Sequence, residues 1–188
     1  MPTKIVSMSI YHKIPIIRDF MRLFHVIPAE FNAIKETLKT ESVSIMLGGV
    51  REMMNVSEKK IQLVIKNRKG IFRAAIESGS SLVPVITYGE NKLFPPLDNS
   101  IIESINSFMY SIFGIALPIP TWTSLKNWMK LYRHPLEKIH SYVGDPVFVS
   151  QKEYPSDEDI LDLKNRYIQH VQDLFEKTND GTYTLEIT

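Results

Sequence analysis

A basic segment near the middle of the chain has the residue types that bind phosphate groups. Six basic residues fall within 15 positions with no acidic residue among them: Lys59, Lys60, Lys66, Arg68, Lys69 and Arg73. Asn67, Arg68, Lys69 and Gly70 lie between an expected strand and an expected helix. A helix N-terminus with Arg and Lys beside it is suited to hold phosphate oxygens. The alternative interpretation is a solvated charged loop.

Two glycine-containing strand ends could approach a ligand closely. Gly48 and Gly49 follow an apolar strand and precede Glu52, whose carboxylate could orient a hydroxyl group or bind a cation. The other reading is a tight turn in which Glu52 favours a helix N-terminus. A second strand contains a proline and ends in a Gly-Glu-Asn sequence, which adds Glu90 and Asn91 as candidate site residues.

Several common catalytic chemistries have no sequence support. The chain has no cysteine, which excludes disulfides, thiolate metal sites and a cysteine nucleophile. No Gly-x-Ser-x-Gly, His-Glu-x-x-His, Walker A or Gly-x-Gly-x-x-Gly motif is present. The five histidines are His12, His25, His134, His140 and His170. His140 and Asp145 have the spacing of a His-x4-Asp dyad, but they flank an expected strand rather than open a helix. Neither His12 nor His25 is near a glycine-rich turn, so no histidine is assigned as a base.

The elements that position these residues alternate between helices and strands. Apolar spacing predicts helices over residues 15–25, 28–38, 69–78 and 156–175. Short apolar runs predict strands over residues 42–47, 61–65, 82–88 and 142–149. This order is typical of an α/β fold, a layered mixed sheet flanked by helices. We expect one domain over residues 1–188, with a core at 15–150 and a closing amphipathic helix at 155–177.

Charge and hydropathy constrain the partners. The 188 residues have a net charge of +1, which argues against a dedicated nucleic-acid binder. Residues 1–140 carry 18 basic and 11 acidic side chains, so the body should prefer an anionic ligand or surface. Residues 104–125 lack charge but are interrupted by Gly114, Pro118 and Pro120. This segment is expected to be a buried helix and loop, or to contact a membrane or line an apolar pocket.

Taken in order, these motifs resemble the type-two diacylglycerol acyltransferase family, with its monoacylglycerol acyltransferase and wax synthase relatives. The matching blocks share the family's order along the chain: residues 48–52, 67–72, 79–85, 88–94 and 143–147. The closing helix is similar too. The resemblance runs from about Pro15 to Ile187.

The resemblance implies a glycerolipid acyltransferase-like fold and a lipid O-acyltransferase. Such an enzyme moves a fatty acyl group from acyl-CoA to a diacylglycerol, a monoacylglycerol or a long-chain alcohol. It implies no metal and no cofactor beyond acyl-CoA as co-substrate. It also implies association with an intracellular membrane, such as the cytosolic face of the endoplasmic reticulum. Arg68 and Lys69 would bind phosphate, Glu52 would help position the acceptor, and the 104–125 segment would hold the acyl chain.

One family motif is missing from these residues. Family members carry His-Pro-His-Gly several dozen residues before Gly-Gly-x-x-Glu, whereas the 47 residues before Gly48 do not contain it. We therefore expect an N-terminally shortened chain whose catalytic histidine is unknown. The alternative function is a non-catalytic acyl-CoA or lipid-binding module, or a truncated pseudoenzyme. A separate His-bearing segment or a second copy of the chain would be its partner.

Overall fold

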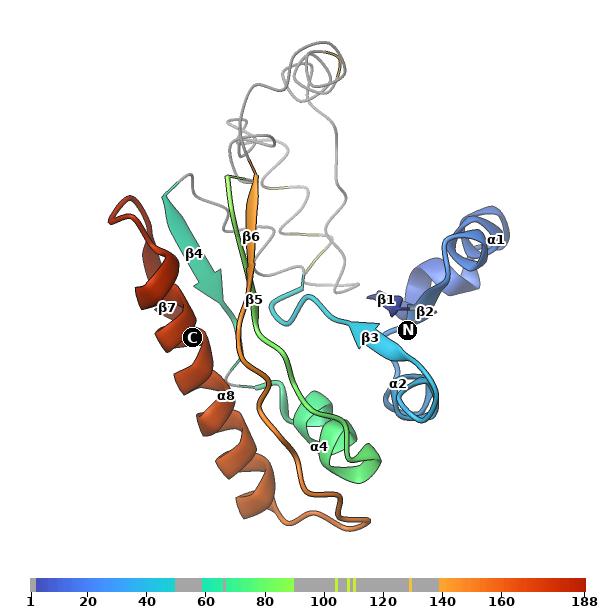
Figure 1. The fold of residues 1–188 in the computed structure, drawn as a ribbon. Helices are drawn as coiled ribbons and strands as arrows, with labels where there is room; N and C mark the ends of the chain where they lie inside the picture. The colour runs from blue at the N-terminus through green and yellow to red at the C-terminus, as the bar shows by residue number, and fades with distance from the viewer. Residues whose placement is uncertain are drawn as a thin grey trace. The chain divides into compact units, whose positions relative to one another are not determined.

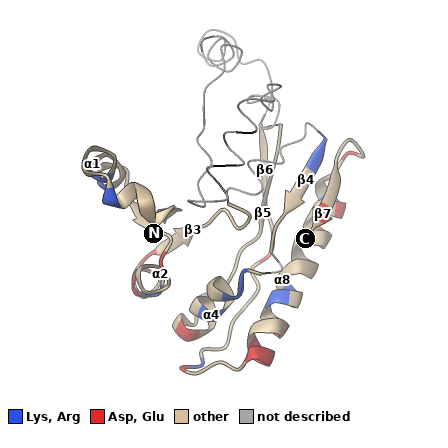
Figure 2. Ribbon diagram, turned by 180° about the vertical axis from the view of Figure 1, so that it is seen from behind, with Lys and Arg blue, Asp and Glu red and all other residues tan. Residues whose placement is uncertain are grey.

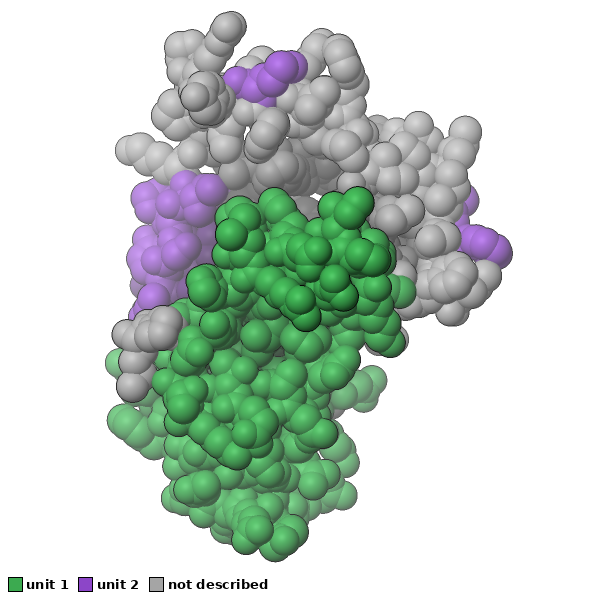
Figure 3. All heavy atoms as spheres, turned by 90° about the vertical axis from the view of Figure 1, so that its right-hand side faces the viewer, with its two compact units in different colours: residues 1–47, 67–84, 144–171 green, residues 48–66, 85–143, 172–188 purple. Residues whose placement is uncertain are grey.

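The computed structural model describes residues 3–49, 59–65, 67–89 and 139–188, together with Ser104, Phe108, Tyr110 and Met129. The chain forms two compact units, each built from three separate segments (Figure 3). The first unit contains residues 1–47, 67–84 and 144–171, and the second contains residues 48–66, 85–143 and 172–188. The expected boundary between a core ending at 150 and a closing helix at 155 stays a prediction.

The first unit begins with a three-stranded parallel sheet. Its strands are β1 (Thr3–Ser7), β2 (Val26–Pro28) and β3 (Ser42–Ser44), in the order β2-β1-β3. A short 3-10 helix η1 (Ser9–Lys13) and α1 (Pro15–Leu23) connect β1 to β2, and α2 (Phe31–Thr37) connects β2 to β3. Figure 1 shows α1 and α2 on either side of this sheet. From β1 the chain crosses to β2 on one side of it, and from β2 it crosses back past β1 to β3 on the other side. The chain therefore reverses its direction across the sheet next to the central strand β1.

Helix α4 (Lys69–Ser78) forms much of the core of the first unit. Its Phe72, Ala74, Ala75 and Ile76 are buried, as is Leu163 of the long C-terminal helix. The helix ends where the sequence predicts, because Gly79 adopts a left-handed φ of 68°. The N–H groups of Gly79 and Ser80 then donate to the carbonyls of Ile76 and Ala75, which satisfies the end of the helix.

The long helix α8 (Asp157–Thr178) begins at a side-chain cap. The Asp159 N–H donates to Ser156 Oγ at 3.2 Å, and the Ser156 N–H donates to Asp159 Oδ2 at 3.0 Å. This reciprocal pair is a capping box with Asp in the third position. Hydrogen bonds from Lys152 and Ser156 lower the pKa of Asp159 to about 2. The predicted helix start at Ser156 is therefore confirmed to within one residue.

We expect Ser156→Ala to lower the free energy of unfolding by about 1 kcal/mol, because the helix loses its side-chain acceptor. Urea denaturation measures the change. The matched control is Ser156→Thr, which keeps the hydroxyl and should lose only a few tenths of a kcal/mol. An equal loss in both variants would mean that the cap is not the cause.

The second unit holds two pairs of strands. Strand β4 (Lys60–Leu63) pairs in parallel with β7 (Thr184–Ile187), and β5 (Val85–Tyr88) pairs antiparallel with β6 (His140–Val143). A salt bridge between Lys60 and Glu186 adds to the first pair. This pairing joins the C-terminal strand to a segment more than 120 positions earlier in the chain.

The structure confirms a mixed α/β class and corrects several element boundaries. Pro28 does not begin a helix: it is the last residue of β2 and pairs with Ser7, while α2 starts at Phe31. The physical reason is that Val26 and Ile27 pair with β1 as an extended strand, and Pro28 continues that strand as the next residue. Strand β3 is shorter than the predicted 42–47. The 82–88 strand splits at Pro84, leaving a single bridge from Leu82 to Val147 before β5.

Candidate functional site

Four candidate phosphate-binding residues lie together at the start of α4 and are all exposed: Asn67, Arg68, Lys69 and Gly70. Arg68 precedes the helix with φ −95° and ψ 52°, and no side chain caps the first turn. The first N–H groups of a helix have no partner within the helix, so they can donate hydrogen bonds to an anion. A Cβ atom added at Gly70 would meet nothing within 4 Å, so this turn is open. Figure 2 shows the basic residues at this end of α4 in blue.

Lys69 already has an anionic neighbour. Its Nζ lies 3.1 Å from Asp157 Oδ1, and both side chains are largely exposed. Asp157 is the first residue of α8, so the starts of α4 and α8 lie side by side here. An exposed ion pair of this kind contributes about 0–1 kcal/mol. Loss of this pair would therefore cost the fold little, and the carboxylate would compete with any other anion for Lys69.

A small apolar cavity lies beside the first turn of α4. Its volume is about 70 Å³, and Phe72, whose side chain is 1% exposed, forms part of its wall. The residues that line it come from the end of β3, from α4, from the segment after α4 and from α8: Ile45, Leu47, Ile71, Phe72, Leu82, Val83 and Tyr167. Ile71 follows Gly70 directly, so an apolar site and a basic site adjoin in the same helix. The predicted acyl-chain segment 104–125 lies almost wholly outside the described residues.

The Gly-Gly turn is confirmed as a turn. Gly49 has a left-handed φ of 58°, and Gly48 is buried. Both belong to the second unit, whereas the residues at the start of α4 belong to the first. Glu52 lies outside the described residues. The sequence could identify this turn because two glycines stand at the end of an apolar strand.

The third candidate segment starts where β5 ends. Tyr88 is the last residue of this strand, and Gly89 follows with φ 91°. Glu90 and Asn91 lie outside the described residues. Two of the nine candidate site residues thus lie in the second unit, four lie at the start of α4, and three lie outside the described residues. The binding roles of all nine remain predictions.

An aromatic cluster around Tyr88 was not predicted. The Tyr88 ring contacts the rings of Tyr142, Phe175 and Tyr183 at centroid distances of 5.7, 6.4 and 4.9 Å. Its hydroxyl lies 2.8 Å from Thr178 Oγ1. Burial raises the pKa of Tyr88. The cluster fixes the end of β5, and therefore the position from which Gly89 and the following residues leave the strand.

A serine–histidine pair is a second feature that the sequence does not predict. Ser7 Oγ lies 3.1 Å from His12 Nε2, at the carboxyl end of the central strand β1. In parallel sheets, ligands bind beyond the carboxyl ends of strands, at the point where connections diverge. The pair was not foreseen because β1 was not predicted. The other described histidines are His25, His140 and His170, and His134 lies outside the described residues.

Two features are absent from the described part of the chain. Across residues 3–49, 59–65, 67–89 and 139–188, His, Asp and Glu side chains do not gather in groups of three or more that could ligate a metal ion. Among the helices placed there, none combines the length and the apolar character needed to cross a membrane.

The sequence is similar to one protein family and to several curated proteins. The model of the family described as Diacylglycerol acyltransferase matches residues 2–186. Human 2-acylglycerol O-acyltransferase 1 is 35% identical over 145 residues, which cover 74% of this chain and 42% of that protein. Diacylglycerol O-acyltransferase 2 of Dictyostelium discoideum is 28% identical over 174 residues, covering 88% and 52%. Diacylglycerol O-acyltransferase 2A of Umbelopsis ramanniana is 27% identical over 188 residues, covering 94% and 52%.

These matches cover a larger share of this chain than of each relative. The chain spans about half the length of the curated relatives it matches. No solved structure matches it.

Proposed function

Because the chain belongs to the diacylglycerol acyltransferase family, we propose that it takes part in transferring a fatty acyl group from acyl-CoA to an acylglycerol. The observation that carries this proposal is the family match, which covers residues 2–186. The names of the relatives, 2-acylglycerol and diacylglycerol O-acyltransferases, favour a monoacylglycerol or diacylglycerol acceptor over a long-chain alcohol. We expect the reaction at the cytosolic face of an intracellular membrane such as the endoplasmic reticulum.

The start of α4 supports the acyl-CoA half of this proposal. Acyl-CoA carries phosphate groups, and Arg68, Lys69 and the first N–H groups of the helix offer donors to phosphate oxygens. The adjoining apolar cavity offers a place for methylene groups, since its wall is built from apolar side chains and Tyr167. At about 70 Å³ the cavity holds only a short piece of an acyl chain.

The chemical step needs groups that the described residues supply only in part. A base must take the proton of the acceptor hydroxyl, and hydrogen-bond donors must stabilise the oxyanion that forms at the thioester carbonyl oxygen. Loss of a base typically costs ~10²–10⁴-fold in rate. The 188 residues contain no His-Pro-His-Gly, so a base supplied from within these residues would have to be a different histidine. His12 is the histidine to test first, because its ring contacts a hydroxyl at a strand end.

Turnover is tested with labelled acyl-CoA and the 188-residue protein in lipid vesicles, with monoacylglycerol and diacylglycerol offered separately. Product above a heat-treated control supports the proposal, and its loss in His12→Ala would assign the base. Binding of acyl-CoA without product would favour the second candidate, a binding module that needs a separate His-bearing segment. Absence of both binding and product would overturn both candidates.

We expect Arg68→Ala to raise the dissociation constant for acyl-CoA about tenfold, because a charge-assisted hydrogen bond to phosphate is lost. Asp157→Asn should instead lower it, because the carboxylate next to Lys69 no longer competes. Titration calorimetry with a non-hydrolysable acyl-CoA analogue measures both changes. Arg166→Ala is the matched control: this arginine pairs with Asp162 at 2.9 Å within α8, more than two turns after Asp157. Equal effects at Arg68 and Arg166 would refute the assigned phosphate site.

A further inference from the structure

Helix α1 leaves its most apolar side in solvent. Ile16, Phe20, Leu23 and Phe24 recur at intervals of three and four residues, so they lie on one side of the helix. Their exposed fractions are 85%, 57%, 72% and 56%. The Phe20 and Phe24 rings contact each other at a centroid distance of 4.6 Å. These four residues are called the apolar face of α1 below.

The rest of α1 explains why this face stays open. Ile17 and Met21 lie on the adjoining side and are half-buried, and Met21 Sδ accepts a hydrogen bond from Ser7 Oγ of β1 at 3.9 Å. The helix is therefore held against its own sheet by a different set of side chains. A cluster of large apolar side chains that is exposed to solvent usually marks an interaction surface.

The charges on α1 indicate the sign of the partner. Arg18 and Arg22 are basic, and Lys13 at the end of η1 lies just before the helix. Asp19 pairs with both arginines and is the sole acidic residue from Lys13 to Phe24, so the net charge of this segment stays positive. Figure 2 shows basic residues on this helix in blue. An α-helix is about 10 Å across, so these cations lie about one Debye length from any surface that the apolar face touches. They favour a surface that carries negative charge.

We propose that the apolar face of α1 inserts into the surface of a phospholipid bilayer that contains anionic lipids. Nine residues are too few to cross a bilayer, but amphipathic helices with apolar and basic sides lie in the interface. A second copy of the chain is less suited to this face. Four partly exposed side chains offer roughly 500 Å², whereas a stable dimer buries about 800 Å² on each partner.

The inference deepens the proposed function, because it names the surface that would bring the chain to a lipid acceptor. Its physical basis is separate, since the exposure and the charges of α1 do not depend on any reaction. A vesicle-binding experiment without acyl-CoA and without acceptor tests it. Binding without turnover would count against the proposed function alone, and turnover without α1-dependent binding would count against this inference alone.

The absence of cysteine allows a site-specific probe. Phe20→Cys and Arg22→Cys are each labelled with an environment-sensitive fluorophore and mixed with phosphatidylcholine vesicles with and without phosphatidylserine. The fluorophore at position 20 should shift to the blue and gain intensity, more strongly with phosphatidylserine. The fluorophore at position 22, on the polar side, should change little. Equal responses, or none at position 20, would overturn the proposal.

Vesicle flotation gives the affinity. The double variant Phe20→Ser, Leu23→Ser should lower the partition coefficient at least about tenfold, because two large apolar side chains no longer leave water. Tyr154→Ser is the matched control, since Tyr154 is an aromatic residue elsewhere in the first unit that is even more exposed than Phe20. The circular dichroism spectrum should be unchanged, because the replaced side chains are exposed. Unaltered flotation, or loss of a dimer in sedimentation with flotation retained, would contradict a lipid partner.

Discussion

Replacing Phe72 by alanine is expected to lower the free energy of unfolding by about 4 kcal/mol. Phe72 is 1% exposed in the first turn of α4, and its ring packs edge-on against Tyr167 of α8 at 5.9 Å. Truncation of a buried phenylalanine removes its transfer free energy and leaves a cavity, which together cost about 3–5 kcal/mol. A cavity of about 70 Å³ already adjoins the ring, and the void left by the truncation would merge with it. Because the new space joins an existing cavity, we expect the cost to lie within this range.

Urea denaturation at several temperatures measures the loss. The control is Leu161→Ala, which removes a large apolar side chain from the half-exposed side of α8 and should cost far less. A cost for Phe72→Ala below that of Leu161→Ala would mean that α4 and α8 do not share a core. If the cavity holds methylene groups of the acyl chain, Phe72→Ala should also relax discrimination against branched acyl-CoA in the proposed reaction.

The parts of the fold that the sequence predicts well are those with a local cause. Helix α4 was predicted with both of its ends, because Gly79 supplies a left-handed stop. The start of α8 was found from Ser156 and the acidic residues after it. Each of these signals lies within a few residues of the boundary that it sets, so no knowledge of the tertiary structure is required.

The missed elements depend on distant partners. Strand β7 is four residues long and exists by pairing with β4, far earlier in the chain. Strand β1 has an apolar core of two residues and is stabilised by neighbours on both sides. A proline at position 28 is an acceptable first residue of a helix, but it also suits the end of a strand. Tertiary pairing decided between them.

The candidate site shows the same division. The run of basic residues located the start of α4, but not the approach of Asp157 from α8, 88 positions away. The apolar cavity is formed by four segments that the sequence does not show to be neighbours. The exposed side of α1 is visible in the sequence as apolar spacing, yet spacing alone cannot say which side a helix buries.

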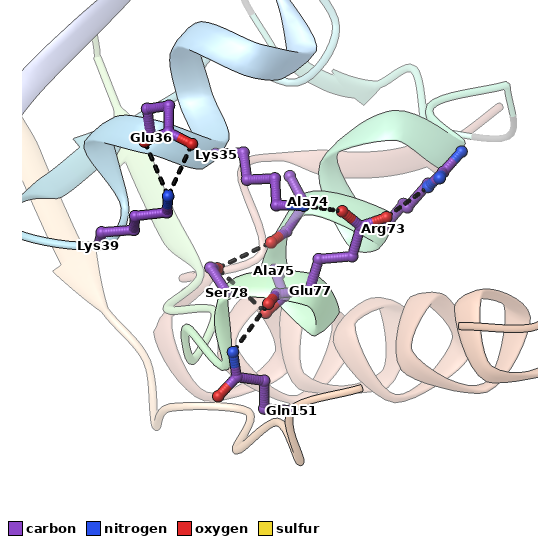
Figure 4. Close-up of polar contacts among 9 residues, drawn as sticks. All are labelled: Lys35, Glu36, Lys39, Arg73, Ala74, Ala75, Glu77, Ser78 and Gln151. Carbon is purple, nitrogen blue, oxygen red and sulfur yellow. Dashed lines mark hydrogen bonds and ion pairs between the residues drawn. The ribbon is translucent and has the colours of Figure 1, made fainter. Parts of the chain in front are cut away.

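Glu77 is a buried carboxylate that joins two helices of the first unit. Its side chain is 4% exposed, and its oxygens accept hydrogen bonds from Lys35 Nζ at 2.5 Å and from Arg73 Nε at 2.7 Å (Figure 4). Lys35 belongs to α2, whereas Arg73 precedes Glu77 by one turn of α4. The Arg73 guanidinium also lies over the Phe31 ring at 5.2 Å. Because Phe31 belongs to α2, this contact is a second link between α2 and α4.

Glu77→Gln should therefore lower the free energy of unfolding by about 2 kcal/mol. Loss of one partner from a buried ion pair costs about 3–5 kcal/mol, and the partial exposure of Lys35 and Arg73 reduces this figure. Glu36→Gln is the matched control, because Glu36 makes an exposed pair with Lys39 on α2 and should cost less than 0.5 kcal/mol, roughly. Hydrogen exchange should also speed up in α2 of Glu77→Gln. Equal losses in the two variants would refute the role of burial.

The pH dependence gives an independent test of the same contact. Hydrogen bonds from Lys35 and Arg73 lower the pKa of Glu77 below its usual value of 4.5. A carboxyl group whose pKa is lowered on folding stabilises the folded state above its unfolded pKa, and this stabilisation is lost as the pH falls through the folded pKa. The difference in stability between the wild type and Glu77→Gln should thus be constant near neutral pH and shrink below pH 4.5. A difference that persists unchanged in acid would show that shape, rather than charge, makes Glu77 stabilising.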